Sequence, residues 1–139
     1  MGSYVGDGYE ISGYISAAVP EASGERLHDA LTFTYRPATR LDNVRVDAEI
    51  AIAGKNRDLD ANSAVEAERV VCRFVASRIV SWDLKVVGIH SVAITSEACE
   101  RIHPFLFASL YRIIRGTQAS DKKPEESKPA TTDEEQVKN

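Results

Sequence analysis

Near the start of the chain, the alternation of apolar and polar residues predicts two β-strands. Residues 31–35 (LTFTY) alternate strictly, as a half-buried strand does. Residues 9–19 alternate less cleanly, but their aromatic and β-branched content favours a strand, and Gly13 within them indicates a bulge or a close approach. Residues 20–24 (PEASG) have turn chemistry. We therefore expect an antiparallel hairpin, which must lay its apolar face on helices because an isolated hairpin is only marginally stable.

Downstream of Pro37, apolar residues spaced three and four apart indicate a first helix. Leu41, Val44 and Ala48 have this spacing, which predicts a helix that begins near Thr39 and stops at Gly54. Residues 44–52 also alternate in the manner of a strand. A third strand at 44–52 therefore stays open as the alternative.

The longest helical pattern runs from Ser63 to Trp82. Ser63 followed by Glu66 has the sequence of a capping box. Apolar residues then recur at helical spacing through Phe74 and Val75, and the stripe is wide enough for burial on more than one side. We expect one helix ending in the segment Trp82-Asp83-Leu84.

The rest of the chain predicts an extended segment, two shorter helices and a polar tail. Residues 85–94 read as a short hairpin or extended excursion. Thr95 or Ser96 can cap a brief helix, and Pro104 can begin another that stops at Gly116. Residues 117–139 contain no aromatic residue and are dominated by Lys, Glu, Ser, Thr and Pro, which is the composition of a disordered tail.

These elements predict an α+β fold, in which a small N-terminal antiparallel β-hairpin packs on a mainly α-helical domain. We expect a flexible N-terminus at 1–8, a single domain at 9–116 and a disordered tail at 117–139. The formal net charge of −4 and the lack of a basic stripe argue against nucleic-acid binding. No apolar run approaches the roughly 20 residues of a membrane helix, and no signal-peptide pattern is present, so we expect no membrane partner.

The candidate chemistry in the sequence is sparse. Cys99 and His103 are four residues apart, and His90 or Cys72 would be needed to complete a zinc site, but no paired C-x-x-C or H-x-x-x-H half-site exists. Both cysteines stand in apolar helical contexts, which predicts buried thiols. We expect no enzyme activity, no metal and no other cofactor.

The last helix suggests an interaction protein, because it is apolar nearly all round and some of that surface has to meet a partner or the rest of the chain. Trp82 is either a core residue or an anchor for a partner, since Trp is enriched in both settings. The residues we propose for partner binding share this apolar or aromatic character and are Trp82, Leu84, Phe105, Leu106, Leu110 and Tyr111.

Five segments carry a resemblance to a known family. They are 33–37 (FTYRP), 79–84 (IVSWDL), 92–95 (VAIT), 102–107 (IHPFLF) and 113–116 (IIRG). In this order they resemble the tail assembly chaperones of long-tailed, siphovirus-like bacteriophages.

The resemblance implies a protein that binds the tape measure protein in the host cytoplasm and keeps it soluble during tail morphogenesis. It also implies binding of the tail tube protein and self-association into a homo-oligomer. The rival hypothesis is a structural virion protein, such as a tail or head-completion component, in which the β-hairpin provides the assembly edge.

Overall fold

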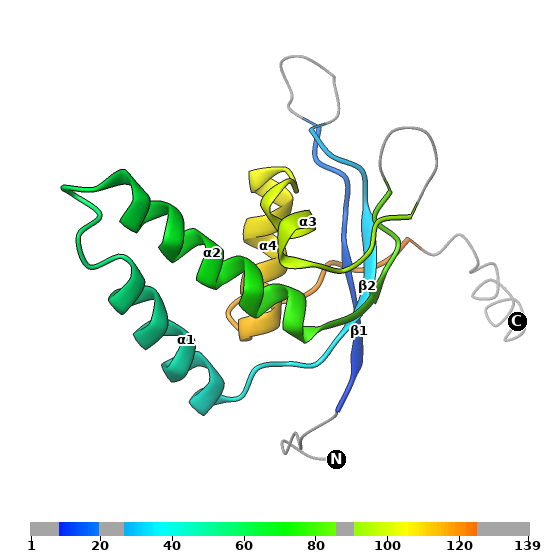
Figure 1. Ribbon diagram of the computed structural model, residues 1–139. Helices are drawn as coiled ribbons and strands as arrows, with labels where there is room; N and C mark the ends of the chain where they lie inside the picture. Colours follow the sequence, from blue (N-terminus) through cyan, green and yellow to red (C-terminus); the bar gives the residue numbers. More distant parts are fainter. Residues whose placement is uncertain (1–8, 20–26, 86–90, 125–139) are drawn as a thin grey trace, which may run out of the picture.

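A computed structural model of the chain describes residues 9–19, 27–85 and 91–124. These residues form an α+β fold with a three-stranded antiparallel sheet and four helices. All four helices lie on one side of the sheet (Figure 1). The predicted α+β class is thus confirmed. The predicted flexible N-terminus at 1–8 and residues 125–139 of the predicted tail lie outside the described residues.

The sheet consists of β1 (Ile11–Ile15), β2 (Leu31–Tyr35) and β3 (Ile79–Trp82), with β2 in the centre. Every second side chain of β2, beginning with Leu31, is buried against the helices, as the alternation predicts. Gly13 of β1 stands opposite Phe33, and a Cβ at position 13 would lie only 2.5 Å from Cζ of the Phe33 ring. The close approach predicted at Gly13 is therefore confirmed.

The third strand, β3, is the main departure from the prediction. The helix expected to reach Trp82 ends at Arg78, and Ile79 is already extended, with φ −87° and ψ 129°. Residues 79–82 then pair with β2, with Phe33 opposite Trp82. The predicted helix end was wrong because the β-branched pair Ile79-Val80 suits a strand as well as an apolar helix stripe, and the pairing with β2 decides between them.

The first helix, α1 (Arg40–Ala53), begins where the spacing predicts. Thr39 Oγ1 accepts a hydrogen bond from Asp42 N–H at 3.1 Å, and Asp42 Oδ2 accepts one from Thr39 N–H at 2.9 Å. This reciprocal capping box satisfies two backbone donors at the helix start. The alternative of a third strand at 44–52 was therefore wrong.

The second helix, α2 (Ala61–Arg78), starts before the predicted cap. Asp60 caps it by accepting a hydrogen bond from Asn62 N–H at 3.0 Å. The capping box predicted at Ser63 was wrong, because the Ser63 hydroxyl donates instead to the carbonyl oxygen of Ala53 at 2.7 Å. Ser63 thus closes the turn between α1 and α2, which run side by side (Figure 1).

The last two helices agree with the sequence. Thr95 caps α3 (Ser96–Glu100), and α4 (Pro104–Arg115) begins with its proline and ends at Gly116, whose φ of 86° is left-handed. Before α3, Lys85 and Ser91 form an isolated antiparallel bridge. The hairpin predicted there lies in part outside the described residues.

The segment after Gly116 lies along the outer edge of β1. Tyr14 N–H donates to Ser120 Oγ at 2.7 Å, Asp121 N–H donates to the Tyr14 carbonyl at 2.8 Å, and Ser16 N–H donates to Asp121 Oδ2 at 2.8 Å. The hydrogen bonds from Ser16 lower the pKa of the Asp121 carboxyl below its usual value. The segment covers an edge strand and extends the contacts of the domain beyond the predicted boundary at Gly116.

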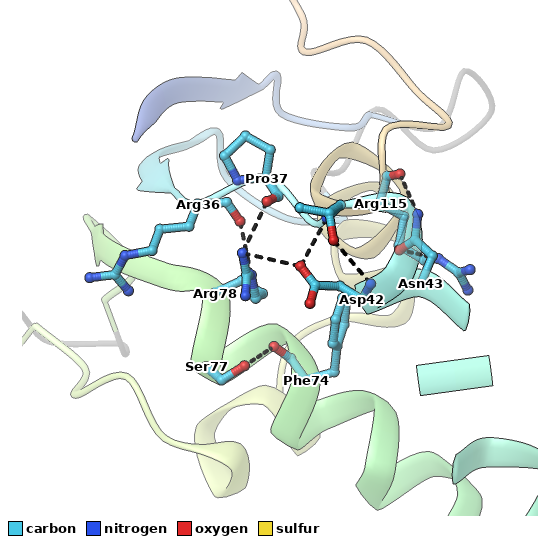
Figure 2. A network of polar contacts seen from close by, with 9 residues as sticks. Arg36, Pro37, Asp42, Asn43, Phe74, Ser77, Arg78 and Arg115 are labelled. Carbon is cyan, nitrogen blue, oxygen red and sulfur yellow. Dashed lines mark hydrogen bonds and ion pairs between the residues drawn. The ribbon is translucent and has the colours of Figure 1, made fainter. Parts of the chain in front are cut away.

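A polar network joins the connection after β2 to the end of α2 (Figure 2). The Arg78 guanidinium donates to the carbonyl oxygens of Arg36 and Pro37, both at 3.0 Å, and lies 3.7 Å from Asp42 Oδ2. The Arg36 N–H in turn donates to the Arg78 carbonyl at 2.8 Å. Arg78 therefore holds the segment that leads into α1 against the end of α2.

A second arginine fixes α1 to α4. Arg115 forms a two-pronged ion pair with Asp47 of α1, at 2.7 and 2.9 Å, and donates to Asn43 Oδ1 at 3.2 Å. The hydrogen bond from Arg115 lowers the pKa of the Asp47 carboxyl, and the same bond raises the pKa of the guanidinium. Figure 2 shows Asn43 beside Arg115. The side-chain amide of Asn43 donates a hydrogen bond to the backbone carbonyl oxygen of Arg115 at 3.1 Å.

Candidate partner-binding surface

Two of the residues proposed for partner binding are core residues. Leu106 is 3% exposed and Leu110 is completely buried. Both lie on α4, which contacts α2 on one side and β1 on another. Sequence reasoning identified α4 as apolar nearly all round but did not foresee that two of its sides are covered within the domain, so these side chains are not exposed on the outer surface of α4.

The other two proposed residues of α4 differ in their surroundings. Phe105 is 60% exposed and is free to contact a partner. Tyr111 is half-buried, with its ring edge-on to Phe74 at 6.1 Å and stacked on Phe107 at 6.5 Å. Its hydroxyl accepts a hydrogen bond from Arg115 at 2.9 Å, so Tyr111 serves chiefly to hold α4 against α2.

Trp82 and Leu84 lie at the margin of the core. Both are half-buried and pack against it. The Trp82 indole N–H donates to the carbonyl oxygen of Val92 at 2.7 Å, and the Val92 N–H donates to the Leu84 carbonyl at 3.1 Å. Trp82 thereby positions the segment that precedes α3, which is a structural role.

An exposed apolar face on α1 was not foreseen. Leu41, Val44 and Ile52 are 56%, 63% and 74% exposed, and Ala48 on the same face is exposed too. Val46, on the opposite face, is 2% exposed. The spacing of three and four that predicts α1 therefore belongs largely to its solvent face. We call Leu41, Val44, Ala48 and Ile52 the outer face of α1.

The sequence carried a signal for this face that was used only to predict the helix. Val46 and Ile50 form the other apolar side of α1, which is flanked by the charged residues Asp42 and Asp47. A helix with two apolar sides has more apolar surface than one neighbouring helix covers. Since α1 packs chiefly on α2, one side is left exposed.

A cavity of about 940 Å³ opens between the start of β2, the segment after β3 and α3. Two of the residues proposed for partner binding, Leu84 and Leu106, line it, together with Leu31 and Ile102. Charged side chains and two histidines, His28 and His103, also line it. Its size is that of a small-molecule or peptide side-chain pocket.

A second hollow, of about 670 Å³, lies between α2, α3 and α4 and is lined by Tyr111, Phe107 and both cysteines. Burial raises the pKa of the Cys72 thiol to about 11 and that of the Cys99 thiol to about 12. Both thiols are free and buried, which confirms that prediction. They are protonated at neutral pH and are therefore poor nucleophiles and metal ligands.

The residues considered for zinc binding do not come together in the described part of the chain. There, no group of three or more His, Cys, Asp or Glu side chains is arranged to hold a metal ion. His103 Nδ1 instead accepts a hydrogen bond from Phe105 N–H at 3.1 Å. His90 lies outside the described residues.

None of the helices in the described segments has the length and apolar content of a membrane span. Comparison of the chain with protein-family models, with curated proteins and with solved structures gave no match. The case for a function therefore rests on the residues and their arrangement.

Proposed function

We propose that this protein is a tail assembly chaperone of a long-tailed bacteriophage, which binds and solubilises the tape measure protein during tail morphogenesis. The observation that carries the proposal is the outer face of α1, where Leu41, Val44 and Ile52 are each more than half exposed. The family is proposed from the resemblance in segments such as 79–84 and 102–107.

The outer face of α1 suits an apolar helical client. An amphipathic helix binds a partner through apolar residues spaced three and four apart, which is the spacing of Leu41, Val44 and Ala48. A scattered apolar residue on a surface needs no explanation, but a continuous apolar stripe indicates an interaction site. Phe105, which is 60% exposed, adds a second apolar contact on α4.

The remainder of the proposal follows from the same role. The chaperone acts in the host cytoplasm, associates with further copies of itself, and helps to bring the tail tube protein to the tape measure protein. Residues 125–139 carry acidic and basic side chains and no aromatic ones, a composition that keeps a complex dispersed in water.

The test is co-expression with the tape measure protein of the same phage. The proposal expects the tape measure protein to become soluble and to co-purify with this chain. If the tape measure protein stays insoluble and no complex is recovered, the proposal is lost.

The structural virion protein remains the second candidate because of β3. This strand is an edge of the sheet, and in the described segments no strand pairs with its outer side. By contrast, Ser120 and Asp121 cover the outer edge of β1. An open edge can accept a strand from a neighbouring subunit. Mass spectrometry of purified particles decides between the two, since a virion protein persists in them and an assembly chaperone is absent.

A further inference from the structure

Two histidines meet at the wall of the 940 Å³ cavity. His28 lies just before β2 and His103 caps α4, and their ring centroids are 5.9 Å apart with the planes tilted by 48°. The two residues are far apart in the sequence, and the fold brings them to one place. The sequence did not predict that these two histidines would lie together.

The backbone contacts of the two rings select opposite tautomers. His28 Nδ1 lies 2.8 Å from the carbonyl oxygen of Asp29. A carbonyl only accepts, so Nδ1 carries the proton and Nε2 is left as an acceptor. His103 Nδ1 accepts from Phe105 N–H, so in a neutral ring Nε2 carries the proton and is a donor.

The two Nε2 atoms are therefore one acceptor and one donor at the same wall. Neither makes a hydrogen bond with any residue of the described segments. A group that both accepts and donates a hydrogen bond would satisfy the pair. An amide does so with its carbonyl oxygen and its N–H, whereas an ester has no donor.

The charges around the cavity favour a neutral ligand. Lys85 and Arg101 bring positive charge, and Asp29, Asp83 and Glu97 bring negative charge. In the described lining, the negative charge of the carboxylates offsets the positive charge of both cations, so the cavity does not attract an anion. The apolar part of the lining fits an aliphatic side chain.

We propose that this cavity binds a neutral amide bearing an aliphatic side chain, the repeating unit of a polypeptide. His103 Nε2–H donates to the amide carbonyl, and His28 Nε2 accepts from the amide N–H. Leu31, Leu84 and Leu106 surround the aliphatic group. The inference goes beyond the proposed chaperone function and stands apart from it, because no residue of α1 lines the cavity.

The tautomers are tested first, by ¹⁵N NMR of the full chain in weakly alkaline buffer, which keeps imidazoles neutral. The three histidines are assigned from single substitutions. We expect His28 as the Nδ1–H tautomer and His103 as the Nε2–H tautomer. Finding the same tautomer at both positions would overturn the proposal.

Binding is tested with N-methyl-4-methylpentanamide, which has a single amide and an aliphatic group, at millimolar concentration. We expect the ring resonances of both histidines to shift. Methyl 4-methylpentanoate, in which an ester oxygen replaces the amide N–H, should bind about tenfold more weakly, the effect of one lost hydrogen bond. Equal binding of the two probes, tighter binding of the carboxylate 4-methylpentanoate, or no shift at either ring would each contradict the proposal.

The substitution His103→Asn separates binding from folding. Asparagine is a good helix N-cap, so the start of α4 is retained while the Nε2 donor is lost, and methylamide binding should fall about tenfold. His28→Phe removes the acceptor and keeps an aromatic ring. If both variants fold and bind as the wild type does, the histidine pair is not the site. If either fails to fold, the comparison of methylamide and ester on the wild type still decides.

Discussion

Arg78 gives the most direct test of how the fold is held together. Its guanidinium satisfies the carbonyl oxygens of Arg36 and Pro37, both at 3.0 Å, and its side chain is only 22% exposed. The substitution Arg78→Met keeps the aliphatic stem but removes both donors. The segment leading into α1 then loses its side-chain attachment to the end of α2 and keeps only the backbone hydrogen bond from Arg36 N–H to the carbonyl of residue 78.

The expected loss is about 3 kcal/mol of unfolding free energy. Hydrogen bonds to a charged group contribute about 1.5–3 kcal/mol each, and partial exposure places these two at the lower end. The contact with Asp42 at 3.7 Å adds little, because partly exposed ion pairs contribute about 0–1 kcal/mol. One kcal/mol corresponds to roughly 4–8 °C in Tm for domains of about 60–100 residues and to roughly 2–4 °C for domains of about 150–250 residues. This domain lies between these sizes, so Arg78→Met should lower Tm by about 12 °C.

Urea denaturation monitored by circular dichroism measures the effect. Arg78→Lys should recover only part of the loss, since an ammonium lacks the planar fork that reaches two carbonyls. Arg73→Met is the matched control, because Arg73 is an exposed residue of the same helix, and it should change stability by less than about 0.5 kcal/mol. If Arg78→Met is no more destabilising than Arg73→Met, the reasoning about this network is refuted.

Three further predictions concern the sheet, the thiols and the helix cap. Gly13→Ala places a Cβ 2.5 Å from Cζ of the buried Phe33 ring and should cost about 1–3 kcal/mol in urea denaturation; an unchanged midpoint would show that the ring moves aside freely. Cys72 and Cys99, whose thiol pKa values are raised to about 11 and about 12 by burial, should stay unreactive toward a disulfide reagent in the folded protein and react once urea is added, and rapid labelling of the native protein would contradict their burial. The hydrogen bond from Thr39 N–H lowers the pKa of the Asp42 carboxyl below its usual 3.8. The ionised Asp42 carboxyl therefore contributes to stability above pH 3.8, and this contribution is lost as pH falls through the lower pKa of the folded state. Asp42→Asn should therefore make unfolding free energy fall less steeply from about pH 5 downward, although part of the slope remains from other carboxyls with lowered pKa values; an unchanged slope would contradict the pKa shift.

The sequence was sufficient where local chemistry decides the structure. Pro104 and Gly116 mark both ends of α4, because a proline suits the first helical turn and a glycine adopts the left-handed stop at φ 86°. The strict alternation of β2 identified its buried face in the same way. The start of α2 was missed because Asp60 and Ser63 are both good caps, and Ser63 is engaged by the Ala53 carbonyl.

The sequence was insufficient where distant contacts decide. In the sequence, Ile79-Val80 continues the apolar stripe of α2. Only the pairing of β3 with β2, which lies more than forty residues earlier in the chain, makes this pair part of a strand. The proposed surface failed at Leu106 and Leu110 for a related reason. Periodicity shows which sides of a helix are apolar, but the whole fold decides which of those sides a neighbouring element covers. Here the apolar sides of α4 are covered, and one apolar side of α1 is exposed.

The central claim is that the outer face of α1 binds an apolar helical client, the tape measure protein. The measurement is the fraction of co-expressed tape measure protein that stays soluble with the wild type, with Val44→Lys on the outer face, and with Glu49→Lys as the control on the same helix. Both substitutions replace exposed residues, so both variants should fold. We expect Val44→Lys to lose the solubilising effect and Glu49→Lys to retain it; a soluble complex of equal yield with Val44→Lys would contradict the account.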